Sequence, residues 1–169
     1  MNGIRVPATA RLSIAAAMTA CLLASSAGVA VAAASPSAAA DAWGKTKKWN
    51  GGLSVTVSKP VKFTPSPYSI GHTTGNQAVK WRITVHNGSD EAFQGALLTV
   101  NVKAGPDGDV CEQIFDGDLG GGITGSVSPG SSGTADFAFD IPRNKLKKVD
   151  VEVVPDFLKD GKHWVGAVK

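Results

Sequence analysis

Residues 79–85 alternate strictly between apolar and polar side chains, and this period of two limits the possible folds more than any other feature. The apolar members are Val79, Trp81, Ile83 and Val85. In a β-strand these four side chains point to one face, whereas a helix would scatter them around its surface. We therefore predict a strand that ends at the turn signal Asn87-Gly88.

The same alternation recurs along the chain, and glycine- or proline-rich turns separate its repeats. The apolar positions are Leu53, Val55 and Val57; Leu98, Val100 and Val102; Ala135, Phe137, Phe139 and Ile141; and Val149, Val151 and Val153. Many short alternating strands of this kind predict an all-β antiparallel β-sandwich of about seven strands, with a closed barrel as the alternative. We expect Trp81 to lie at the centre of the core, with Phe137 and Phe139 across from it.

The N-terminus has a different pattern. Arg5 and Arg11 precede a charge-free, alanine-rich run over residues 12–34, which ends in small residues. This arrangement predicts a secretory signal peptide over residues 1–34 and an extracellular protein with no stable membrane span after cleavage. A retained membrane anchor is one alternative, since the run is long enough to span a bilayer, and lipidation at Cys21 is another. We expect a flexible tail over residues 35–50 and the sandwich domain over residues 51–169.

Charge and cysteine content narrow the function classes further. Of the 17 Lys and Arg residues, Arg5 and Arg11 lie in the signal, and 15 remain against 14 Asp and Glu residues. A nearly neutral exported domain lacks the basic face that nucleic-acid binding needs. Cleavage would also leave Cys111 as a single cysteine, which we expect to be a buried thiol. An intermolecular disulfide and a reactive thiol are the alternatives.

An acidic cluster is the strongest metal candidate in the sequence. Its members are Asp107, Asp109, Glu112, Asp116 and Asp118, of which Asp107, Asp109, Asp116 and Asp118 are weak calcium candidates. Carboxylates two residues apart can converge on one hard cation. The EF-hand pattern fails, however, because Gly120 and Val127 stand where it requires oxygen ligands. The other interpretation is a solvated acidic loop, and no cofactor is predicted.

Catalytic motifs are missing from the sequence. The histidines His72, His86 and His163 are far apart and form no HExxH motif. The Gly-x-Ser-x-Gly nucleophile elbow is also absent. A hydrolase would need a histidine, a carboxylate and a Ser or Cys brought together by the fold. We therefore assign no catalytic residue and expect the protein not to be an enzyme.

Several short motifs occur in an order that resembles a known family. They are AVKWRITVHN at residues 78–87, CEQIFD at 111–116, VSPG at 127–130 and VDVEVVP at 149–155. This order resembles a family of secreted bacterial immunoglobulin-like proteins, which includes mycobacterial immunoprotective antigens and uncharacterised exported proteins of actinobacteria. The resemblance covers residues 52–168. It implies an immunoglobulin-like sandwich outside the membrane, with no shared catalytic residues to carry over. Because Cys111 stands alone, no intersheet disulfide is assumed.

These observations favour a secreted, non-enzymatic protein that binds an unknown protein or cell-surface ligand. On such a scaffold the loops carry recognition, and the long ones span residues 63–76 and 105–125. A cell-envelope carbohydrate-binding module is the alternative if Trp43, Trp49, Trp164 and Tyr68 are exposed for stacking on sugars. The competing interpretation is that Trp49 and Trp164 pack at the ends of the sandwich. A secreted hydrolase is the remaining hypothesis.

Overall fold

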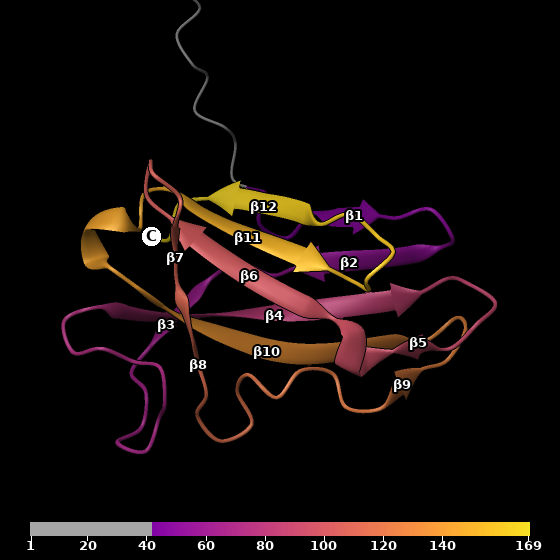
Figure 1. The fold of residues 1–169 in the computed structure, drawn as a ribbon, viewed down its shortest axis with the longest axis horizontal. Coiled ribbons are helices and arrows are strands. Elements are labelled where there is room, and N and C mark those ends of the chain that lie inside the picture. Colours follow the sequence, from indigo (N-terminus) through magenta and orange to yellow (C-terminus); the bar gives the residue numbers. More distant parts are fainter. Residues whose placement is uncertain (1–41) are drawn as a thin grey trace, which may run out of the picture. The chain divides into compact units, whose positions relative to one another are not determined.

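The computed structural model describes residues 42–169, and this part of the chain is built almost entirely of β-strands (Figure 1). The predicted signal peptide and the first residues of the predicted tail lie outside the described residues. Two short 3-10 helices occur, η1 (Gly95–Leu97) and η2 (Arg143–Lys145). The strands are β1 (Thr46–Lys48), β2 (Leu53–Val57), β3 (Val61–Phe63), β4 (Gln77–Asn87), β5 (Phe93–Gln94), β6 (Thr99–Ala104), β7 (Asp109–Val110), β8 (Glu112–Ile114), β9 (Ser126–Val127), β10 (Ser132–Ile141), β11 (Val149–Val154) and β12 (Lys162–Gly166).

The strands form two main antiparallel sheets. The larger sheet has the order β1-β2-β4-β10-β8, and β3 also pairs with β4. The smaller sheet has the order β12-β11-β6-β7, and Figure 1 shows it lying over the larger one. The runs β2-β4-β10-β8 and β12-β11-β6 match the A-B-E-D and G-F-C orders of an immunoglobulin-type sandwich. The predicted all-β sandwich is therefore confirmed: seven strands of residues 42–169 follow this order, and β1, β3, β5, β7 and β9 are additional short strands.

Apolar side chains from both sheets fill the space between them, as the alternation predicts. Trp81 on β4 is completely buried, and its ladder partner on β10 is Phe137. The Trp81 ring meets Phe139 edge-on at 6.4 Å between ring centroids and Trp43 at 5.8 Å. The expected position of Trp81 at the centre of the core is confirmed.

The predicted flexible tail over residues 35–50 is wrong for its last nine residues. Residues 42–50 carry β1, which pairs with β2, and both Trp43 and Trp49 are buried. The indole N–H of Trp43 donates to the Ala167 carbonyl at 3.0 Å, and that of Trp49 donates to the Asp160 carbonyl at 2.8 Å. Two tryptophans bury enough apolar surface to hold this segment on the sandwich. The folded domain therefore includes residues 42–50, which the sequence assigned to the tail.

Cys111 behaves as a small apolar side chain, as expected. It is buried within the main core, and burial raises the pKa of its thiol to about 11, with a smaller contribution from the charge of Asp140. A thiol with so high a pKa is almost entirely protonated at neutral pH, so it is a poor nucleophile. Within residues 42–169, no helix has the length and apolar character needed to cross a membrane.

Candidate functional site

Three large apolar side chains that the core does not use lie in or against the connection between β3 and β4. Tyr68 is 92% exposed and Ile70 is 71% exposed, and both lie in the connection between β3 and β4. Phe115, just after β8, is about half exposed. We call residues 64–76 the anchored loop, and Tyr68, Ile70 and Phe115 the loop patch.

Backbone pairing fixes the middle of the anchored loop. Ile70 and Phe115 exchange two N–H to carbonyl hydrogen bonds, each 2.9 Å long, so they form an isolated antiparallel bridge. Side chains directly opposite each other in such a pair lie close together on the same face. The next residue, Gly71, has a φ of +86°, and a Cβ there would lie 2.1 Å from the Gln113 carbonyl oxygen. Only glycine allows the loop to approach β8 this closely.

A carboxylate fixes the start of the anchored loop. Asp116 accepts hydrogen bonds from the Ser66 hydroxyl at 2.6 Å and from the Ser66 backbone N–H at 2.8 Å. These two bonds, the hydroxyl first, hold the pKa of Asp116 below its ordinary value because they stabilise the charged form. Asp116 is therefore a structural clamp on the loop.

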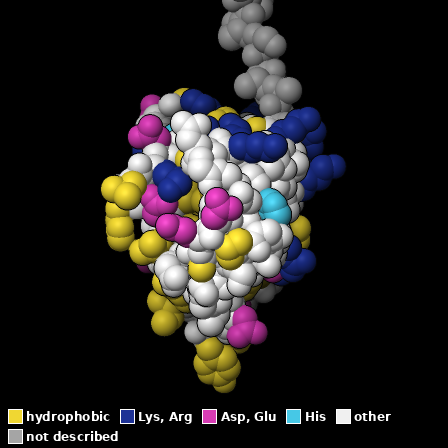
Figure 2. Space-filling view, turned by 90° about the vertical axis from the view of Figure 1, so that its right-hand side faces the viewer, with side chains coloured by type: hydrophobic (Ala, Val, Ile, Leu, Met, Phe, Trp, Pro, Cys, Tyr) yellow, Lys and Arg dark blue, Asp and Glu magenta, His cyan; other side chains and the backbone are white. Residues whose placement is uncertain are grey.

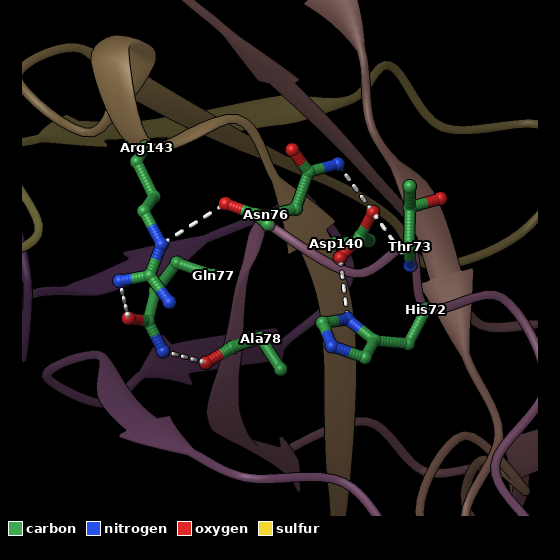
Figure 3. Close-up of polar contacts among 8 residues, drawn as sticks. His72, Thr73, Asn76, Gln77, Ala78, Asp140 and Arg143 are labelled. Carbon is green, nitrogen blue, oxygen red and sulfur yellow. Dashed lines mark hydrogen bonds and ion pairs between the residues drawn. The ribbon is translucent and has the colours of Figure 1, made fainter.

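A second carboxylate, Asp140 on β10, fixes the end of the anchored loop (Figure 3). Asp140 is only 5% exposed. It accepts hydrogen bonds from His72 Nδ1 at 2.7 Å, from Asn76 Nδ2 at 2.6 Å and from the Thr73 backbone N–H at 3.3 Å. Burying a carboxylate is costly unless such donors surround it. The loop and Asp140 therefore depend on each other.

Arg143 extends this second anchor on its outer side (Figure 3). Its Nε donates to the Gly75 carbonyl at 3.0 Å, and one Nη donates to the Gln77 side-chain oxygen at 3.3 Å. The Gln77 amide in turn donates to the Ala78 carbonyl at 3.0 Å. The anchored loop is thus held at its start, its middle and its end, and it presents Tyr68 and Ile70 from a fixed backbone.

The alternation of side chains along β10 places Asp140 on the face of the strand opposite Phe139 and Ile141, which lie in the core. The side chain is nevertheless shielded from solvent, because the anchored loop covers it. The sequence gives little indication that this loop covers Asp140, since His72, Thr73 and Asn76 are ordinary loop residues. The carboxylate that they bond to lies 64 to 68 positions away.

The four calcium candidates do not form a site in the described part of the chain. Asp107 lies in the exposed turn before β7, and Asp118 lies in the exposed loop after β8. Asp109 pairs with Lys145, while Asp116 is occupied by Ser66. Among residues 42–169, no group of three or more metal-ligating side chains comes together. The predicted loop over residues 105–125 is also divided, because it contains β7 and β8.

The three histidines lie in separate places. His72 pairs with Asp140, His163 lies 3.1 Å from Asp150, and the His86 Nδ1 lies 3.2 Å from the Ser132 hydroxyl. A hydrolase of the predicted type requires one histidine between a carboxylate and a nucleophile. None of these three, within the described hydrogen bonds, contacts both kinds of group.

Comparisons with known proteins bear on the fold alone. No protein-family model and no curated protein matches this chain. Among solved structures, the yjhA protein of Bacillus subtilis aligns with a TM-score of 0.59 at 17% identity, over 75% of this chain and 98% of that one.

A second B. subtilis protein, ycdA, is described as a candidate lipoprotein and aligns with a TM-score of 0.58 at 11% identity. The match covers 72% of this chain but 38% of ycdA, so the chain spans well under half of that protein. Neither structure is a mycobacterial antigen, and that family resemblance stays a prediction. The chain therefore shares its sandwich fold with these two bacterial proteins.

Proposed function

We propose that the protein is an extracytoplasmic, non-enzymatic binding module that contacts a partner protein through the loop patch. The observation that carries the proposal is the exposure of Tyr68 and Ile70 on a loop that is held at three points. Single exposed apolar side chains are common on protein surfaces. Figure 2 shows several of them on one face of this domain. Here Ile70 and Phe115 are paired across a β-bridge, and Tyr68 lies two residues before Ile70 on a loop that two carboxylates also hold.

The physical advantage of this arrangement is preorganisation. Ordering a flexible recognition loop costs free energy at the moment of binding, and a loop that is already held avoids most of that cost. Complete burial of a fully exposed large apolar side chain contributes roughly 1.5–3 kcal/mol, so covering Tyr68 and Ile70 would add most of this each and Phe115 about half. Tyrosine is also among the residues that most often dominate protein interfaces.

The location of the module rests on the N-terminal sequence pattern. The description of ycdA as a candidate lipoprotein agrees with a place outside the cytoplasm. Fractionation of the organism that encodes the chain, followed by mass spectrometry of the mature N-terminus, tests this directly. We expect the protein outside the cytoplasm with an N-terminus close to Ser35. Cytoplasmic protein that retains Met1 would contradict the proposed location.

Site-specific photo-crosslinking tests the binding surface. The full chain carries the substitution Tyr68→p-benzoylphenylalanine and is expressed in the organism that encodes it. Phe157→p-benzoylphenylalanine is the matched control, because Phe157 is 88% exposed but lies in another loop. We expect one discrete protein adduct from position 68 only, and we expect Ile70→Ser to abolish it. No adduct, or the same adducts from both positions, would refute the proposed surface.

Of the four aromatic residues named for the carbohydrate-binding alternative, only Tyr68 is exposed. Trp43, Trp49 and Trp164 are all buried, so they offer no row of exposed rings for sugar stacking. Their indole N–H groups donate to backbone carbonyls within the domain. Sugar binding on this protein would therefore need residues other than these three tryptophans.

A further inference from the structure

The outer face of the larger sheet carries a row of aligned threonines. The strand registers place Thr46, Thr56, Thr84 and Thr134 side by side across β1, β2, β4 and β10. The Thr46 and Thr56 hydroxyls lie 2.7 Å apart, and those of Thr84 and Thr134 lie 3.4 Å apart. The hydroxyl at each end of the row is therefore oriented by a neighbour.

The Thr134 end of this row borders a cavity of about 550 Å³. One wall is formed by Arg82, Thr134 and Asp136, and the other is the glycine-rich segment after β8, which contributes Asp118, Leu119 and Thr124. We call this cavity the hydroxyl groove. Its volume lies within the range of small-ligand sites, although its lining is far more polar than is usual.

The charges in the wall disfavour an anionic ligand, because Arg82 is paired with Asp136 and Asp118 adds a second carboxylate. Arg82 donates to both carboxylate oxygens of Asp136, at 2.9 Å from Nε and 3.1 Å from Nη. This fork neutralises the two charges and raises the pKa of Arg82, so the pair stays intact across the physiological range. An anionic ligand would have to compete with Asp136 for Arg82, whereas a neutral ligand would leave this ion pair in place.

The fork still offers hydrogen bonds to a ligand. A guanidinium carries five N–H donors, and Asp136 uses two of those on Arg82. The Arg82 side chain is 65% exposed, so its outer edge is accessible from solvent. The hydroxyls of Thr124 and Thr134 add groups that both donate and accept. Donors and acceptors fixed close together are what a ligand rich in hydroxyl groups requires.

The opposite wall allows a ring to approach the backbone closely. Gly117, Gly121 and Gly122 present no side chains toward the groove. Leu119 supplies an apolar contact for the C–H face of a ring. Aromatic rings are absent from the described lining of the groove. Without rings on which a sugar can stack, binding should therefore be weak.

We propose that the hydroxyl groove binds a neutral sugar chain, with Arg82, Thr134 and Thr124 contacting its hydroxyl groups. This goes beyond the proposed protein-binding function, because the groove and the loop patch share no residue. Such a chain has two sources. One is the amino-sugar polymers of bacterial envelopes, and the other is polysaccharides built from neutral sugars. Their shared chemistry is a series of uncharged, hydroxylated rings.

Affinity electrophoresis of the full chain tests the proposal. Native gels contain β-glucan, xylan, mannan or glycol chitin, and a gel without polymer is the reference. We expect at least one polymer to retard the protein, and the glycol chitin lane separates an amino-sugar source from the others. If none of the four polymers retards the wild-type chain, the proposal is overturned.

Variants then locate the binding. Thr134→Val and Arg82→Gln should each weaken retardation about fivefold to tenfold, since each removes hydrogen bonds to the ligand. Thr46→Val is the matched control, because it removes a hydroxyl from the far end of the same row. We expect it to bind as the wild-type chain does, and equal losses for Thr46→Val and Thr134→Val would refute the groove. Ile70→Ser should leave retardation unchanged, which separates this result from the outcome for the loop patch.

Discussion

Replacing Asp140 by alanine should be the most informative single change, because Asp140 joins the anchored loop to the sandwich. The substitution removes the acceptor for three hydrogen bonds, from His72, Asn76 and the Thr73 backbone. It leaves the apolar core between the sheets untouched, since Asp140 lies on the opposite face of β10. The effect therefore reports on the anchor and not on core packing.

The magnitude follows from the number of donors and their access to water. A hydrogen bond to a charged group contributes about 1.5–3 kcal/mol, and a buried donor left unsatisfied costs about 1–3 kcal/mol. The His72 side chain is 24% exposed, so part of the loop can regain hydrogen bonds from water. We therefore expect a total loss of about 3 kcal/mol. For a domain of this size, that corresponds to a fall of roughly 10 °C in melting temperature.

Asp136 provides a matched control on the same strand. Its carboxylate pairs with Arg82 near the surface, and surface ion pairs contribute about 0–1 kcal/mol. Urea unfolding and thermal melts of Asp140→Ala and Asp136→Ala, together with amide hydrogen exchange over residues 71–76, measure the difference. We expect fast exchange in this segment for Asp140→Ala only. If the two variants lose equal stability, Asp140 is not the anchor that its contacts imply.

Three further predictions concern single side chains. Trp81→Ala should cost about 3–5 kcal/mol in urea unfolding, and Trp81→Phe should cost much less because it keeps most of the ring. Ser66→Ala should raise the pKa of Asp116 toward its ordinary 3.8, as measured by NMR titration of the carboxyl carbon. The stability that Ser66 adds should be complete above pH 3.8 and should disappear as the pH falls through the lowered pKa of folded Asp116. Iodoacetamide at pH 8 should label Cys111 only after unfolding, as peptide mapping would reveal, because the folded thiol is buried with a pKa of about 11.

The positions of the main strands could be predicted from the sequence because the period of two is a local property of each segment. The alternating segments became β2, β4, β6, β10 and β11. Residues 46–48 were missed because Thr46, Lys47 and Lys48 show no apolar alternation. They form β1 through pairing with β2, while the flanking Trp43 and Trp49 bury themselves in the domain. A strand that depends on its neighbours in this way leaves little trace in its own sequence.

The contacts that hold the anchored loop could not be predicted from the sequence, for a related reason. Each is a polar contact between residues at least 45 positions apart, namely Ile70 with Phe115, Ser66 with Asp116, and His72 with Asp140. Hydrophobic periodicity carries information about which face a residue occupies, but not about which distant loop covers that face. Of the predicted exposed aromatics, Tyr68 is exposed, whereas Trp43, Trp49 and Trp164 are buried.

The two parts of the domain are stabilised by different kinds of interaction, and this has a consequence for function. The sandwich depends on a large apolar core between two sheets. The anchored loop depends on hydrogen bonds to Asp116 and Asp140 and on its β-bridge with Phe115. Changes in the loop can therefore alter the recognition surface while the sandwich stays folded. A binding module built in this way can change its ligand without losing its fold, because the energy of folding lies mainly elsewhere.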